Sequence, residues 1–117
     1  MYGRYPIRLE VPVGRISISQ ATIHAMKDPQ FVALGIEANP LVLKIFRVPY
    51  GLRVRVTSSK EFYIKSKEMM KGLCEIIPLL NEPCSYKLWG KIYEDGMRFP
   101  LDTLEKIERP QNESSDD

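Results

Sequence analysis

The chain reads as two consecutive copies of one pattern, in which strand, break, strand, short helix and hairpin follow in the same order. The first copy covers residues 7–48 and the second covers residues 52–104. In the first copy the opening strand, break and second strand are residues 7–11, 12–14 and 15–19. In the second copy they are residues 52–56, 57–60 and 61–66. A unit of this size cannot bury its apolar face alone. The repeat therefore predicts a β-rich α+β fold, a small barrel or sandwich of two β-β-α-β-β repeats with approximate two-fold symmetry.

The serines Ser19 and Ser66 stand where each copy changes from a period of two to helical spacing, and both are good N-cap residues. They predict helices over residues 20–27 and 67–77. The expected buried positions of these helices are Ile23, Met26, Met69, Met70, Leu73, Ile76 and Ile77. Alternation also predicts that Leu52, Val54 and Val56 point inward.

Each helix is followed by a predicted hairpin. The first joins residues 31–36 to 41–48, and the second joins 86–93 to 97–99 through the turn at Glu94-Asp95-Gly96. Pro100 predicts that the last strand lies at a sheet edge, since proline cannot donate to a ladder. Residues 101–107 are expected to add one helical turn.

Length and charge predict one compact domain over residues 1–107 and a mostly disordered acidic tail over 108–117. The last ten residues carry a net charge of −3, so the total of +2 leaves +5 on the body. A moderately basic body permits nucleic-acid binding without requiring it. No apolar run approaches the ~20 residues of a membrane span, and the first residues lack a signal-peptide core, so the expected compartment is the cytoplasm.

Residues 14–19, with the sequence Gly-Arg-Ile-Ser-Ile-Ser, precede a short helix and a hairpin. In this the chain resembles the AbrB/SpoVT-type swapped-hairpin domain, over about residues 7–48 and more loosely over 52–104. The resemblance implies an interlocked barrel, normally built by two chains and here by two repeats of one chain. It also implies DNA binding near the Gly-Arg turn, and a role as a transcription regulator or antitoxin. Ser19 departs from the family, which usually has proline there, and Lys60-Glu61 replace Gly-Arg in the second copy.

The outward arginines of the first strands are the candidate nucleic-acid contacts, because pseudo-symmetry would bring both sets onto one face. The predicted nucleic-acid-binding residues are Arg8, Arg15, Arg53, Arg55, Lys60 and Lys65. The alternative is that these side chains only cover solvated strand faces. The exposed ion pairs that arginine and glutamate form there contribute little to stability. Trp89 and Tyr93, which alternate with Lys87 and Lys91, form a second candidate surface, either for stacking on bases or for a protein partner. The opposite face of that strand, with Tyr86 and Leu88, competes for the core.

The chain offers little for catalysis or for a cofactor. His24 is the single histidine, Cys74 and Cys84 do not form a C-x-x-C pair, and no phosphate loop or hydrolase motif is present. We therefore expect no enzyme, no metal and no cofactor. The predicted function is a non-enzymatic DNA-binding regulator or antitoxin-like protein. The alternative is a protein-interaction or structural module, a homodimer among its forms, that binds no nucleic acid.

Overall fold

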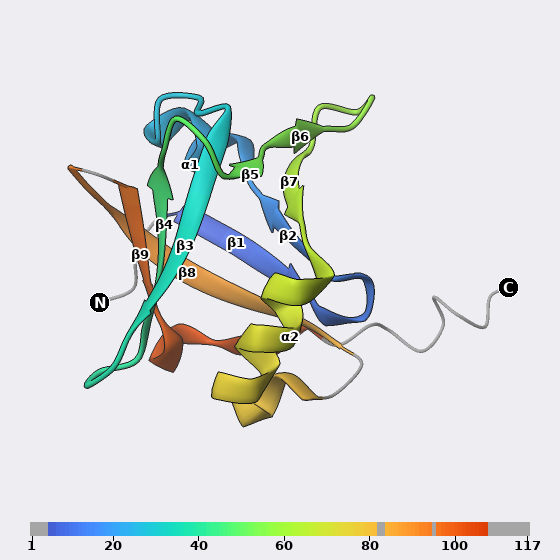
Figure 1. Cartoon of the computed structure of the whole chain (residues 1–117), viewed down its shortest axis with the longest axis vertical. Coiled ribbons are helices and arrows are strands. Elements are labelled where there is room, and N and C mark those ends of the chain that lie inside the picture. The colour runs from blue at the N-terminus through green and yellow to red at the C-terminus, as the bar shows by residue number, and fades with distance from the viewer. Residues whose placement is uncertain (1–4, 82–83, 95, 108–117) are drawn as a thin grey trace, which may run out of the picture.

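The computed structural model describes residues 5–81, 84–94 and 96–107. It is a strand-rich, nearly closed antiparallel barrel with two α-helices (Figure 1). The first half contains β1 (Tyr5–Glu10), β2 (Arg15–Ile18), α1 (Gln20–Ala25), β3 (Phe31–Glu37) and β4 (Val42–Arg47). The second contains β5 (Leu52–Arg53), β6 (Arg55–Val56), β7 (Phe62–Lys65), α2 (Lys67–Ile76), β8 (Ser85–Tyr93), β9 (Gly96–Pro100) and β10 (Glu105–Ile107). The 3-10 turns are Val11–Val13, Pro78–Asn81 and Leu101–Thr103.

Strand order around the barrel is β5-β3-β4-β9-β8-β1-β2-β7-β6, with β10 added beside β8. The barrel nearly closes at the segment that the sequence predicts as one strand over residues 52–56. That segment is two short strands: β5 pairs with β3, and β6 pairs with β7 on the opposite edge. The chain therefore crosses between the two edges of the sheet at Val54, and the prediction that Val56 points inward is wrong, because Val56 is 55% exposed.

Both helix starts follow from their serine caps. Ser19 Oγ accepts a hydrogen bond from the Thr22 backbone N–H, and Ser66 Oγ accepts one from the Met69 backbone N–H, each at 3.1 Å. This confirms the two predicted N-caps. The helices lie at opposite ends of the barrel (Figure 1).

The core fills the barrel and extends under both helices. Its buried apolar side chains are Ile7, Leu9, Ile16, Ile18, Ile23, Met26, Val32, Leu43, Ile45, Ile64, Met70, Leu73, Ile77, Leu80, Tyr86, Leu88, Met97 and Phe99. The predicted burial of Ile23, Met26, Met70, Leu73 and Ile77 is confirmed. Ile76 is 50% exposed, so its predicted burial is wrong.

The prediction that the last strand of the second hairpin is an edge strand is also wrong. The strand β9 does not lie at an edge, because it pairs with both β4 and β8; Pro100 is simply its last residue. The predicted helical turn is present as the 3-10 turn Leu101–Thr103, and it is followed by strand β10, which pairs with β8. The predicted acidic tail, residues 108–117, lies outside the described residues.

Candidate nucleic-acid interface

Cross-strand register places five basic residues on one outer surface of the barrel. Ile16 and Ile18 of β2 point into the core, so Arg15 and Ser17 point outward. Residues directly opposite in paired strands share a face. The register therefore gives one outward row, Lys87, Arg8, Ser17, Tyr63 and Arg55, and a second row, Ser85, Glu10, Arg15 and Lys65. We name Lys87, Arg8, Arg15, Lys65 and Arg55 the first basic wall.

Like charges lie directly opposite each other within the first basic wall. Lys87 on β8 faces Arg8 on β1, and Arg15 on β2 faces Lys65 on β7. Such pairs destabilise a sheet. Glu10, opposite Arg15, and Glu105, opposite Lys87, offset part of this cost, and a bound anion would offset more of it.

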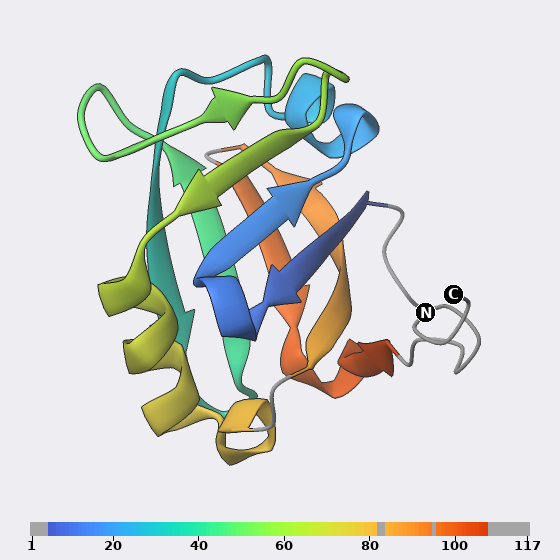
Figure 2. The same ribbon diagram turned by 90° about the vertical axis from the view of Figure 1, so that its right-hand side faces the viewer.

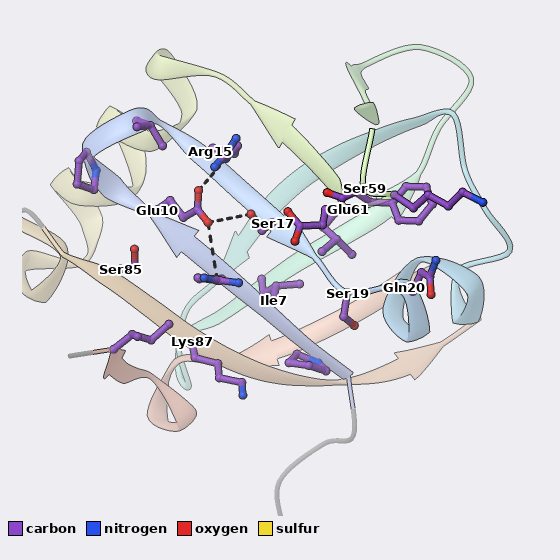
Figure 3. A pocket seen from close by; sticks show the side chains of 18 residues that line it. Ile7, Glu10, Arg15, Ser17, Ser19, Gln20, Ser59, Glu61, Ser85 and Lys87 are labelled. Atoms are coloured by element: carbon purple, nitrogen blue, oxygen red, sulfur yellow. Dashed lines mark hydrogen bonds and ion pairs between the residues drawn. The ribbon is translucent and has the colours of Figure 1, made fainter. Parts of the chain in front are cut away.

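Glu10 is the carboxylate at the centre of the first basic wall, and its side chain is 13% exposed. It accepts hydrogen bonds from Arg15 Nε at 2.7 Å and from Ser17 Oγ at 3.0 Å, and it lies 3.7 Å from Arg8 Nε (Figure 3). The Arg15 guanidinium also lies 5.1 Å from the centre of the Tyr63 ring, within the range of a cation–π contact. Arg15 is therefore held on two sides, by a carboxylate and by an aromatic face.

An open groove of about 830 Å³ runs over β1 and β2 beside this network (Figure 3). The turn before β7 contributes Ser59, Lys60 and Glu61, and the start of α1 contributes Ser19 and Gln20. The charged lining residues are Arg8, Arg15, Lys60 and Lys87 against Glu10 and Glu61, a net charge of +2. Serine hydroxyls at positions 17, 19, 59 and 85 add neutral hydrogen-bonding groups. A groove with this lining suits an anionic ligand rich in hydrogen-bond acceptors.

The predicted nucleic-acid-binding residues divide between two places. Arg8, Arg15, Arg55 and Lys65 belong to the first basic wall, and Lys60 lines the groove from the β6–β7 turn, where its backbone has a φ of 65°. Arg53 lies on β5 opposite Phe31 and lines a smaller groove of about 190 Å³ near α1. The sequence reasoning missed Lys87 as a member of this set, because only the pairing of β8 with β1 brings it beside Arg8.

The structure decides which face of β8 is internal. Tyr86, Leu88 and Gly90 are buried, so Lys87 and Trp89 point outward. Lys87 Nζ lies 4.4 Å from the centre of the Trp89 ring system, and Arg98 Cζ lies 4.9 Å from the centre of the Tyr93 ring. Both predicted partner-binding aromatics are therefore covered in part by cations of the same chain.

The remaining candidate groups have ordinary surroundings. His24 Nδ1 lies 2.6 Å from Asp28 Oδ1, and both side chains are exposed. The Cys74 thiol donates a hydrogen bond to the Leu80 carbonyl at 3.3 Å, and burial raises its pKa. Across the residues that the structure describes, no group of three or more His, Cys, Asp and Glu side chains could hold a metal ion.

In comparisons with known proteins, no protein-family model, no curated protein and no solved structure matches the chain. Among the described helices, none has the length and apolar character needed to cross a bilayer. The resemblance to the AbrB/SpoVT-type domain is therefore a proposal that is supported by this chain's own sequence and strand pairing.

Proposed function

We propose that the protein is a non-enzymatic DNA-binding protein of the regulator or antitoxin-like kind, and that it contacts the duplex with the first basic wall. The observation that carries this proposal is the placement of Lys87 opposite Arg8 and Arg15 opposite Lys65, beside a groove of net positive charge. Phosphates placed between the members of such pairs would convert a repulsion into charge-assisted hydrogen bonds.

We also propose that the barrel is a duplicated β-β-α-β-β unit, as a single-chain counterpart of the swapped-hairpin domain. The pairings support it. The hairpins β1–β2 and β3–β4 correspond to β6–β7 and β8–β9, while β2–β7 and β4–β9 join the two halves. The remaining contacts match as well. The short strands β5 and β6 together take the place of β1, and β8 takes the place of β3, so the pairing of β5 with β3 corresponds to the pairing of β1 with β8.

The test of DNA binding is a salt titration by fluorescence anisotropy with a labelled duplex. With about four phosphate contacts, the slope of log affinity against log salt concentration is expected near −3.6, about −0.9 per contact. Raising the salt from ~50 to ~200 mM should weaken binding by roughly two decades. A folded protein that binds no duplex at ~50 mM salt would eliminate the proposal.

Matched variants locate the contact. Replacing Arg8 and Lys65 by Ala should flatten the slope by about 1.8, for two lost contacts. The control removes an exposed arginine and an exposed lysine outside the wall, Arg47 of β4 and Lys71 of α2, and should leave the slope unchanged. Equal effects of the two double variants would show that the wall is not the binding surface.

The second candidate function is a protein-interaction module, and one observation favours it. Ile92 and Tyr93, at the end of β8, are 43% and 48% exposed and form an apolar tip next to the turn. Exposed apolar residues of this size are common in protein interfaces. Sedimentation equilibrium of the wild type and of Ile92→Ser tests whether this tip joins two copies: a dimer lost in the variant would favour the module.

A further inference from the structure

A second row of like charges crosses a different part of the barrel. Lys44 on β4 faces Arg98 on β9, and Arg98 faces Lys91 on β8. We name Lys44, Arg98 and Lys91 the second basic wall. Among the described cross-strand pairs, four consist of two basic residues each. Two others pair opposite charges, Glu10 with Arg15 and Glu105 with Lys87. The basic–basic pairs are divided equally between the two walls.

Glu37 offsets the second basic wall in part. Glu37 Oε2 accepts from Lys44 Nζ, and Glu37 Oε1 accepts from Arg98 Nη1, both at 3.0 Å. Lys91 is exposed and takes no part in the two hydrogen bonds that Glu37 accepts. Three cations against one carboxylate leave a net charge of +2 on this surface.

Neighbouring side chains hold two cations of the second basic wall, Lys44 and Arg98, in place. Lys44 Nζ lies 5.2 Å from the centre of the Phe46 ring, and Arg98 lies over Tyr93. Gly35, opposite Lys44, brings no side chain of its own. Lys44 and Arg98 are thus held by aromatic rings and by Glu37, so a polyanion would find these two cations already ordered.

The two walls meet at β8, and the other strands that carry them lie on opposite sides of the barrel. In Figure 2, β1 and β2 lie in front of the barrel, and β4 and β9 lie behind them. The first basic wall projects from the outer side of β1, β2, β6 and β7 and, at Lys87, of β8. The second projects from the outer side of β4 and β9 and, at Lys91, of β8. One duplex lying over β1 and β2 would leave Lys44 and Arg98, on the other side of the barrel, free for another.

We propose that the second basic wall is a separate phosphodiester-binding surface, so that one barrel bridges two DNA duplexes. Its occupant is inferred from charge: the repeated anionic groups of a nucleic-acid backbone match a row of cations at neighbouring strand positions. The second surface is inferred from the pairs Lys44–Arg98 and Arg98–Lys91 alone. Bridging of two duplexes also rests on the proposed function, in which the first basic wall binds DNA.

The variant Lys91→Glu tests this proposal without endangering the fold. It replaces a like-charge pair with Arg98 by an opposite-charge pair, so its melting temperature should be equal to or above that of the wild type. The control is Lys71→Glu, which makes the same charge change at an exposed position of α2. Both variants are compared with wild type in two assays: anisotropy with one labelled duplex, and capture of a labelled duplex by an unlabelled duplex fixed to beads.

The expected result is that wild type and Lys71→Glu capture the second duplex, and that Lys91→Glu captures about tenfold less while binding a single duplex nearly normally. Tenfold corresponds to the loss of one or two charge-assisted hydrogen bonds. If Lys91→Glu and Lys71→Glu capture equal amounts of the second duplex, the proposal that the second basic wall binds DNA is wrong. Any bridging would then come from two protein molecules that associate through another surface. Binding of one duplex with no capture by wild type would also overturn it and leave the proposed function intact. Loss of single-duplex binding in Lys91→Glu, with none in the Arg8 and Lys65 variant, would support the second surface and refute the first.

Discussion

The Nε of Arg15 donates a 2.7 Å hydrogen bond to Oε1 of Glu10, the residue directly opposite it on β1. This bond turns the most central cation of the first basic wall toward a carboxylate that also accepts from Ser17 and faces Arg8. Glu10 therefore neutralises part of the wall and at the same time holds its arginines in place. The balance of these two effects can be measured.

The first prediction is that Glu10→Gln binds duplex DNA more tightly than wild type. Glutamine keeps an acceptor for Arg15 and Ser17 but removes the negative charge that a phosphate must approach. Exposed ion pairs are worth about 0.2–1 kcal/mol, so the gain in affinity should be about 1.4- to fivefold. Anisotropy at ~50 mM salt is the measurement. The control is Glu75→Gln on α2, and weaker binding by Glu10→Gln would show that holding Arg15 matters more than removing the charge.

The second prediction concerns two glycines with opposite surroundings. A Cβ on Gly90 would meet the ring of buried Phe99 and would lie 2.8 Å from the Arg98 carbonyl oxygen. Gly90→Ala should therefore destabilise the protein by about 1–3 kcal/mol, as overpacking does. A Cβ on Gly72, within α2, would meet nothing within 4 Å. Gly72→Ala should stabilise by about 0.5–1 kcal/mol, because alanine loses less entropy in a helix. Urea unfolding measures both, and the same sign for the two variants would contradict the packing described.

The third prediction tests the face of α2 that meets the core. Leu73 is buried and Ile76 is half exposed on the same helix. Leu73→Ala should cost about 2–5 kcal/mol of unfolding free energy. Ile76→Ala, an aliphatic truncation at a surface position, should stay within about 0.5 kcal/mol. Comparable losses in the two variants would show that Ile76 packs in solution against a surface absent from the monomer.

The fourth prediction is a pH dependence set by Glu37. The hydrogen bond from Lys44 lowers the pKa of the Glu37 carboxyl below its ordinary value of 4.5, and the charges of Lys44 and Arg98 lower it further. A carboxyl whose pKa is lower in the folded protein stabilises it above the pKa of the unfolded chain, and this contribution is lost as the pH falls through the folded value. The difference in urea midpoint between wild type and Glu37→Gln should therefore be present at about pH 7 and should disappear at about pH 2.5. A difference that persists in acid would mean that Glu37 acts through packing and not through its charge.

The sequence by itself determined the local elements, because these depend on neighbours in the chain. The caps Ser19 and Ser66 and the helical spacing of Met70, Leu73 and Ile77 predicted both helices. Alternation of Ile7 and Leu9 with Arg8 and Glu10 predicted which side chains of the first strand face the core. It failed at Val56 because strand pairing there changes from one edge of the barrel to the other, and a change of partner leaves no mark in a pattern of period two.

The tertiary structure alone decided which basic residues stand together. Lys87 and Arg8 are 79 positions apart in the chain, and they become neighbours because β8 pairs with β1 in one particular register. The second basic wall arises in the same way, from the pairing of β4 with β9 and of β9 with β8. Arg53 was placed with the other arginines by its spacing, and the break at Val54 put it beside a different groove. Register between distant strands is set by how the whole core packs, since a shift of one residue would turn every side chain of a strand to the opposite face. The charges on the outside of the barrel are therefore arranged by the apolar residues within it.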